Sequence, residues 1–218
     1  KCIVLDLDNT LWGGIVDEDG FDGIELGQTS NGKAFVEFQK QLLSLWQQGI
    51  ILAINSKNNF DDAMKVIREH PDMILREKHF GNIQINWNDK AQNMQKISEE
   101  LNIGLSSFVF FDDDKTNQER IKSEFTEILT IDLDSDPSTY VKKLKDLNDF
   151  NILQRTDEDI KRGEMYSQQR QRNELKESVS NLNDFLQKLD IKVTKINIDN
   201  HADNVIPGSA NAVFNIRY

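Results

Sequence analysis

The chain has 218 residues, 38% of them hydrophobic, and a formal net charge of −11. Its length is sufficient for one large domain, or for one domain with an extension, around a sizeable core. The acidic balance excludes a basic nucleic-acid-binding surface, and no apolar stretch is long enough to cross a bilayer, so we expect neither nucleic acid nor a membrane as a partner. A single cysteine excludes an internal disulfide and suits a reducing compartment, which makes the cytoplasm the expected location.

Strands and helices are predicted to alternate along residues 1–150. Short apolar runs predict strands that begin at Cys2 and that cover residues 50–55, 72–75, 108–111 and 128–131. Apolar spacing and helix start and stop residues predict helices at residues 33–48, 61–69, 89–101, 119–125 and 138–147. Residues 13–32 are rich in glycine and aspartate and are expected to form a loop or β-flap rather than a helix. This alternation is typical of an α/β fold with a doubly wound parallel sheet.

The remaining residues follow a different pattern. Residues 156–189 predict a long amphipathic helix with a seam of apolar side chains, namely Leu175, Val179, Leu182, Leu186 and Leu189. Residues 167–173, in its earlier half, are polar all round and are expected to project into solvent. Residues 192–198 alternate like a strand, and no complete unit follows them. We therefore predict one domain at residues 1–150, a helical extension at 151–190 and the start of an incomplete domain at 191–218.

Two aspartates stand where the first predicted strand ends. Asp6 and Asp8 would share a face if the strand continued, and they would diverge if the chain turned there. Ligands of open α/β sheets bind beyond the carboxyl ends of the strands. Two carboxylates at such a place repel each other unless a proton or a metal ion neutralises them. The segment therefore indicates a chemical role.

Several short motifs follow one another along the chain in a specific order. Asp6-x-Asp8-x-Thr10 is followed by Ser56 after the second strand, by Lys90 near the start of a later helix and by an acidic cluster after the fourth strand. This set resembles the haloacid dehalogenase (HAD) superfamily. Residues 5–14, 55–58, 70–73, 85–87 and 108–113 are similar to its FkbH-like subfamily, in a region that covers roughly residues 1–198. A lone Asp-x-Asp-x-Thr is a weak signal, whereas the ordered set is specific.

The resemblance implies a reaction through a phosphorylated aspartate, in a HAD-like catalytic domain at residues 1–150. Asp6 would be the nucleophile that accepts a phosphoryl group. Asp8 would protonate the leaving group and later activate water, and Thr10 would orient Asp8. Lys90 would offset the negative charge of Asp6 and of the phosphate. The alternative for Asp6 and Asp8 is a strand end with solvated carboxylates.

The resemblance also implies a phosphate site at the end of the second strand. Ser56 and the backbone amides there would hydrogen-bond the phosphate oxygens, with Lys57 and Asn58 beside them. A serine after a strand is also a common helix N-cap, which is the alternative for Ser56. Lys57 is equally well explained as a surface lysine.

Mg²⁺ is the cofactor that the resemblance implies. Asp6, the backbone carbonyl of Asp8 and an acid of the cluster would bind it, with Asp113 the first choice and Asp112 the second. Asp114 stands where the family is expected to have asparagine, so the choice among the three aspartates stays open. The alternative for residues 112–114 is a turn followed by a helix N-cap.

The stretch before the first helix leaves room for only a flap, whereas HAD enzymes of small molecules often carry a large cap. An open mouth admits a macromolecule. The subfamily resemblance implies dephosphorylation of 1,3-bisphosphoglycerate and transfer of the glyceryl unit to an acyl carrier protein. Such a transfer would pass through an enzyme thioester, but Cys2, in a buried strand, is expected to be inert. Trp12 is expected to pack against the flap, and residues 192–198 would begin the GNAT-like (acetyltransferase-like) domain that follows in the subfamily.

Two other functions stay open. A plain phosphatase acting on a phosphorylated metabolite, sugar or protein would release phosphate without an acyl acceptor. A non-catalytic binding module of a larger biosynthetic protein would keep the fold and lose the chemistry. The intact set of candidate site residues disfavours the binding module, and these residues are Asp6, Asp8, Ser56, Lys90 and Asp113.

Overall fold

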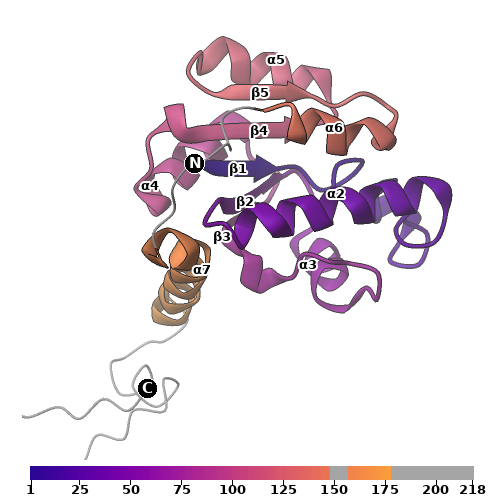
Figure 1. Ribbon diagram of the computed structural model, residues 1–218, viewed down its shortest axis with the longest axis horizontal. Helices are drawn as coiled ribbons and strands as arrows, with labels where there is room; N and C mark the ends of the chain where they lie inside the picture. The colour runs from indigo at the N-terminus through magenta and orange to yellow at the C-terminus, as the bar shows by residue number, and fades with distance from the viewer. Residues whose placement is uncertain (148–156, 178–218) are drawn as a thin grey trace, which may run out of the picture. The chain divides into compact units, whose positions relative to one another are not determined.

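The computed structural model describes residues 1–147 and 157–177, and the chain divides into two units, Lys1–Arg170 and Gln171–Tyr218. The first unit is built on a five-stranded parallel sheet (Figure 1). Its strands are β1 (Cys2–Leu5), β2 (Ile51–Ser56), β3 (Phe80–Ile85), β4 (Phe108–Asp112) and β5 (Leu129–Asp132). They lie in the order β3-β2-β1-β4-β5. The predicted α/β fold with a doubly wound parallel sheet is confirmed.

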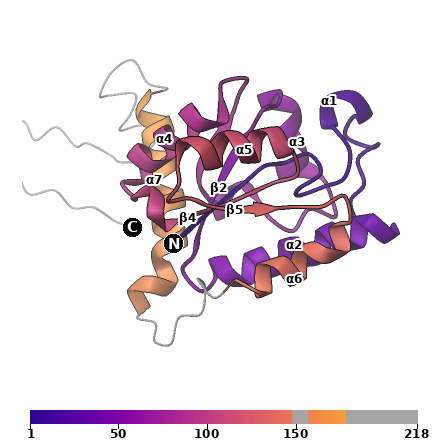
Figure 2. The same ribbon diagram turned by 90° about the horizontal axis from the view of Figure 1, so that it is seen from above.

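Helices cover both faces of the sheet, as Figure 2 shows. On one face lie α2 (Ser30–Trp46) and α6 (Tyr140–Lys145), and on the other lie α4 (Lys90–Leu101) and α5 (Lys115–Glu124). The other helical segments are α1 (Val16–Asp19), α3 (Phe60–Glu69), α7 (Asp157–Glu177) and the 3-10 helices Glu77–His79, Leu105–Ser107 and Pro137–Thr139. Of the helices in the described residues, none combines the length and apolar character that a membrane crossing requires.

Side-chain caps explain why several helices begin earlier than predicted. The hydroxyl of Thr29 accepts a hydrogen bond from the backbone N–H of Gly32, so α2 begins at Ser30 instead of residue 33. The carboxylate of Asp114 accepts one from Thr116, and α5 therefore begins four residues before the predicted start at residue 119. These caps add three residues to α2 and four to α5 that the apolar spacing alone does not indicate.

The strand predicted at residues 72–75 is wrong. The backbone N–H groups of Ile74 and Leu75 donate to Gln39 Oε1 at 2.9 and 3.1 Å, so this segment is satisfied by a side chain of α2 rather than by a strand. The third strand is β3 instead. Its apolar pattern is interrupted by Asn82 and Gln84, whose amides hydrogen-bond with each other and with Glu100. Because these two polar residues interrupt the apolar run, the sequence pattern did not indicate a strand here. Their hydrogen bonds allow them to be buried in it.

The segment at residues 13–32 is a flap with a short helix in it. Gly13 and Glu25 pair as an antiparallel bridge, with backbone hydrogen bonds of 3.0 and 2.8 Å. The expectation of a flap agrees with this pairing. The expectation that the segment contains no helix is wrong, because α1 lies within it and α2 begins in it.

Helix α7 contributes buried residues to the first unit. Gly163 lies so close to Trp46 that an added Cβ would be 2.5 Å from Nε1 of the indole, which explains the glycine. Ser167 and Arg170 are buried, and Arg170 Nε donates to the carbonyl of Phe80 at 3.1 Å. The expectation that residues 167–173 project into solvent is therefore wrong for these two side chains.

The second half of the predicted extension and all of the predicted incomplete domain lie outside the described residues. These include all of the apolar seam beyond Leu175 and the predicted strand at residues 192–198. The predicted domain boundaries at residues 150 and 190 stay a prediction.

Candidate active site

The carboxyl ends of β1 and β4 meet at the point where the strand order reverses. From β1 the chain continues to β2 and β3 on one side and to β4 and β5 on the other. Leu5 pairs in register with Phe111, so Asp6 and Asp112 follow on adjacent strands. Open α/β sheets bind their ligands at such a switch point.

The two-residue period of the strands sends both carboxylates toward α4. Val4 and Phe110 pack into the core on the side of α4 and α5. Two residues further along, Asp6 and Asp112 take the same side. The first turn of α4 lies on this side, and its Lys90 contacts both carboxylates.

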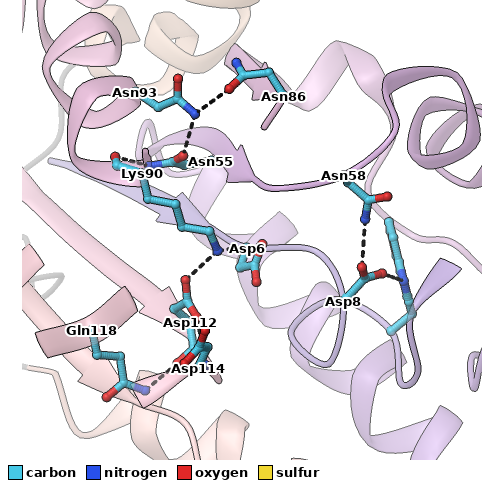
Figure 3. A network of polar contacts seen from close by, with 11 residues as sticks. Asp6, Asp8, Asn55, Asn58, Asn86, Lys90, Asn93, Asp112, Asp114 and Gln118 are labelled. Carbon is cyan, nitrogen blue, oxygen red and sulfur yellow. Dashed lines mark hydrogen bonds and ion pairs between the residues drawn. The ribbon is translucent and has the colours of Figure 1, made fainter. Parts of the chain in front are cut away.

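Lys90, the first residue of α4, lies between Asp6 and Asp112 (Figure 3). Its Nζ is 3.0 Å from Asp6 Oδ1 and 2.6 Å from Asp112 Oδ2, and its side chain is only 3% exposed. Burial lowers the pKa of Lys90, but the two carboxylates more than offset this and raise it above its usual value. The ammonium stays charged although it stands at the positive end of a helix dipole, because it has these partners.

Asp113 adds a third carboxylate to the group. Oxygens of Asp6, Asp112 and Asp113 lie within 4.8 Å of one another. Burial and the charge of Asp6 raise the pKa of Asp112 to about 7 and that of Asp113 to about 6. The group holds three carboxyl groups and one ammonium, that of Lys90. When the carboxyl groups are ionised, this largely buried site has an excess of negative charge. A divalent cation that prefers oxygen ligands suits this set of donors.

Asp114 has a different place from its two neighbours. Its carboxylate accepts a hydrogen bond from the N–H of Thr116 at 2.7 Å and caps α5. The backbone N–H of Asp114 donates to Asp112 Oδ1 at 2.8 Å. The acidic run is thus a turn with an N-cap at Asp114, and Asp112 and Asp113 are its two members that approach Asp6.

Asp8 lies beyond the end of β1, where the chain turns away. Asn9 has a φ of 53°, a left-handed conformation that asparagine tolerates. Figure 3 shows the side chain of Asp8 pointing to Asn58, while Lys90 points to Asp6 and to the end of β4. The two aspartates of the Asp-x-Asp pair therefore diverge, which was one of the two arrangements that the sequence left open.

Three donors hold the carboxylate of Asp8. Its Oδ1 accepts hydrogen bonds from Trp12 Nε1 at 2.8 Å and from the backbone N–H of Val16 at 3.1 Å. Its Oδ2 accepts one from Asn58 Nδ2 at 2.8 Å. Burial raises the pKa of Asp8 to about 6, and the hydrogen bonds only partly oppose this. Both the acid and the carboxylate are therefore accessible near neutral pH.

Thr10 does not orient Asp8 in this structure. Its side chain is buried, and its Oγ1 has no hydrogen-bond partner within the described part of the chain. The backbone N–H of Thr10 donates to Leu7 at 3.0 Å and so shapes the turn. The side-chain hydrogen bonds to Asp8 come instead from Trp12 and Asn58, and the orienting role implied for Thr10 stays a prediction. Trp12 is fully buried, in agreement with the expected packing role.

Ser56 is the last residue of β2, and the two residues after it differ in exposure. Ser56 is buried, and it is not the cap of α3, because Asn59 accepts the hydrogen bonds from the first turn of that helix. Lys57 is exposed. Asn58 is buried, with its amide on Asp8. A phosphate-binding role for Ser56, Lys57, Asn58 and Thr10 stays a prediction.

Asn55 supports the site and was missed by sequence reasoning. Its Nδ2 donates to the backbone carbonyl of Lys90 at 2.9 Å, and its Oδ1 accepts from Asn93 at 3.2 Å. Asn93 also donates to Asn86 at 3.0 Å (Figure 3). This network ties the first turn of α4 to the end of β2. A polar residue late in an otherwise apolar strand was the available signal.

A cavity of about 730 Å³ adjoins Asp113. The flap, the end of β5 and the ring of Tyr140 contribute to its walls. Among its lining residues is Lys115, the only lysine, and the carboxylates that line it are Glu25, Asp113, Asp114, Asp132 and Asp134. The lining of the cavity therefore carries an excess of acidic side chains.

Cys2 lies at the other end of β1 from Asp6. It is fully buried, and burial raises the pKa of its thiol to about 12. A protonated, inaccessible thiol is a poor nucleophile. This agrees with the expected inertness of Cys2.

These features define an α/β protein with a Rossmann-like parallel sheet and an acidic site at its switch point. No protein-family model matches the chain. The structure is similar to a crystal structure of the N-terminal part of a Bacteroides fragilis protein, described as containing a phosphatase domain complexed with Mg. The TM-score is 0.69 and the sequence identity 38%, over 71% of this chain and 42% of that chain.

A second similarity is confined to a short segment. Over 32 residues the chain is 66% identical to the succinyl-diaminopimelate desuccinylase of Pelagibacter ubique (strain HTCC1062). The segment is 15% of this chain and 8% of that enzyme, so it carries no argument about activity. The chain thus spans less than half the length of either protein.

Proposed function

We propose that this chain is a Mg²⁺-dependent phosphatase or phosphotransferase of the HAD type, acting through an aspartyl phosphate. The observation that carries the proposal is the group of Asp6, Asp112 and Asp113 at the switch point, in which Asp6 and Asp112 are paired with the buried Lys90. The similarity to a phosphatase domain that binds Mg supports it.

The chemistry divides into two steps. A carboxylate oxygen of Asp6 attacks phosphorus, the bond from phosphorus to the leaving oxygen breaks, and that oxygen takes a proton from Asp8. Water then attacks the phosphorus of the acyl phosphate and gives a proton to Asp8. The bond from phosphorus to the Asp6 oxygen breaks, which releases inorganic phosphate and restores the carboxylate. The divergence of Asp8 from Asp6 suits this division of roles.

The donor set fits Mg²⁺. Asp6, Asp113 and the backbone carbonyl of Asp8 would hold the ion, since both oxygens of Asp112 already have partners, Lys90 at 2.6 Å and the backbone N–H of Asp114 at 2.8 Å. The bound ion would neutralise charge on the phosphate and on the nucleophile. Lys90 meanwhile holds Asp6 through the ion pair of 3.0 Å, and the hydroxyl of Ser56 would be a donor to a phosphate oxygen.

Phosphate release from 4-nitrophenyl phosphate and from an alkyl phosphate tests the proposal. We expect turnover that requires Mg²⁺ and is lost in EDTA. Asp6→Asn should reduce turnover by at least about 1,000-fold, because the nucleophile is removed, while circular dichroism stays unchanged. Full turnover in the Asp6→Asn variant would contradict the mechanism.

We further propose the FkbH-like reaction, in which 1,3-bisphosphoglycerate is dephosphorylated and the glyceryl unit passes to an acyl carrier protein. The motif resemblance and the small flap at the mouth support it. Incubation with 1,3-bisphosphoglycerate, Mg²⁺ and a pantetheinylated carrier, followed by mass analysis, tests it. A mass gain on the carrier is the expected result, and phosphate release without that gain would exclude it.

A plain phosphatase is the second candidate, and the cavity favours it. An acidic lining with one lysine repels a second phosphate on the substrate and accepts a neutral or cationic leaving group. The burial of Cys2 also removes the chain's one thiol as a thioester carrier. Faster turnover of monophosphates with neutral alcohols than of bisphosphates would support this candidate.

A further inference from the structure

Asp8 is held from two directions, by Asn58, which is 50 residues away in sequence, and by Trp12, which is four residues away. Asn58, in the loop between β2 and α3, donates to Oδ2, and Trp12, in the loop after β1, donates to Oδ1. Both side chains are buried, at 2% and 0% exposure. Asp8 itself is only partly buried. The two donors therefore have fixed positions, and the carboxylate is held against them.

The orientation of the Asn58 amide follows from its second hydrogen bond. Asn58 Oδ1 accepts from the backbone N–H of Asn59 at 2.9 Å, and a backbone N–H can only donate. The oxygen must face Asn59, so the NH₂ group must face Asp8. The indole of Trp12 is likewise a donor only. A flip of the Asn58 amide would break its bond to Asn59, and the indole of Trp12 has no acceptor to offer. Both groups can therefore only donate to Asp8.

The position of Asp8 makes such support necessary. The turn after β1 leaves Asp8 without the strand to direct it, and Thr10 makes no hydrogen bond to it. A cation at Asp6 and Asp113 would attract any further carboxylate that is free to rotate. A carboxylate drawn onto the metal would no longer be available to transfer a proton.

We propose that Asn58 and Trp12 are positioning residues that hold Asp8 beside the metal site for proton transfer. The inference rests on the proposed function, in which Asp8 is the acid and base. Neither side chain needs to contact the substrate. Their effect is on the placement of Asp8, and reactions are sensitive to small errors of placement.

Leaving groups of different basicity test this proposal. An alkyl phosphate needs a proton on its leaving oxygen, whereas 4-nitrophenolate leaves readily without one. In Asn58→Leu, which keeps the size of the side chain and removes the donor, kcat/KM for the alkyl phosphate should fall by about 10-fold to 100-fold. The value for 4-nitrophenyl phosphate should change much less. Trp12→Phe, which keeps a ring and removes the indole donor, should show the same selectivity.

A double-mutant cycle provides the second readout. Asp8→Asn should show the same selectivity as Asn58→Leu to a larger degree. Adding Asn58→Leu to Asp8→Asn should cost nothing further, because no acid remains to be positioned. Asn82→Leu is the matched control, since it removes a buried amide that donates to Glu100. It should leave the ratio of the two substrates unchanged.

The outcomes separate the two proposals. Equal losses for both substrates in Asn58→Leu and Trp12→Phe, or additive losses in the cycle, would overturn the positioning role and leave the phosphatase intact. If the unmodified protein released phosphate from neither substrate in Mg²⁺, the proposed function would fail, and the positioning role with it. If one variant does not fold, the other still gives the ratio.

Discussion

Lys90 sets the charge balance of the candidate site. Within residues 1–147 and 157–177 it is the one cation paired with Asp6 and Asp112, and all three side chains are buried or nearly so. Removing one partner of a buried ion pair leaves the other charge uncompensated, which costs more than the pair contributes. For Lys90 the cost includes the mutual repulsion of the carboxylates that it separates.

Replacing Lys90 should therefore destabilise the metal-free protein in a pH-dependent way. For Lys90→Met in EDTA, we expect the free energy of unfolding to fall by about 3 kcal/mol at neutral to alkaline pH. The loss should shrink toward about pH 5, because Asp112, whose pKa is raised to about 7, can then bind a proton. Urea unfolding at both pH values measures this. An equal loss at both would contradict the charge argument.

Arg170 joins α7 to the start of β3. It lies in α7, and its guanidinium donates to the carbonyls of Phe80 and Glu77 at 3.1 and 3.2 Å. It also approaches the carboxylate of Glu77 at 3.6 Å. These contacts are at the amino end of β3, whereas the candidate site is at the carboxyl ends of the strands. Stability and activity should therefore separate at this residue.

In Arg170→Leu we expect the free energy of unfolding to fall by about 2 kcal/mol, because buried carbonyls lose charged donors. The rate of phosphate release should not change. Urea unfolding and a turnover assay on the same preparation check both parts. Arg172→Leu is the matched control, since Arg172 is exposed on the same helix and should have little effect. A large loss of turnover in Arg170→Leu would show that α7 also supports the site.

The candidate metal site links folding to pH for the whole molecule. The pKa values of Asp112 and Asp113 are raised to about 7 and about 6, above the ordinary value of 3.8. A carboxyl whose pKa is raised by folding binds protons more tightly in the folded state. The metal-free protein therefore loses stability from these groups as the pH rises from about 4 to about 7.

Mg²⁺ should reverse this loss, since it binds the deprotonated carboxylates. We expect the rise in Tm on adding Mg²⁺ to be small near about pH 5 and to grow through about pH 7. At about 100 times its Kd the ion adds roughly 2.7 kcal/mol. Thermal melts in Mg²⁺ and in EDTA measure the difference. Asp113→Asn should abolish most of it, and a shift that is independent of pH would argue against carboxylate ligation.

Periodic patterns of apolar residues predicted those strands and helices whose buried face is made of residues close together in sequence. The apolar run before Asp6 and the helical spacing of α2 and α4 reappear as predicted, because each reflects a period of two or of 3.6 residues. The strand β3 did not, because Asn82 and Gln84 interrupt its pattern and are satisfied by a distant helix.

The sequence also indicated Asp6, Lys90 and Asp113, because acids follow the apolar strand runs and because the motifs occur in a specific order along the chain. The contact of Asp8 with Asn58 and that of Arg170 with Phe80 could not be predicted from the sequence. Asn58 is 50 residues from Asp8, and Phe80 is 90 residues from Arg170. No local period relates such residues, because they meet only when the strands align in register and the loops close over them.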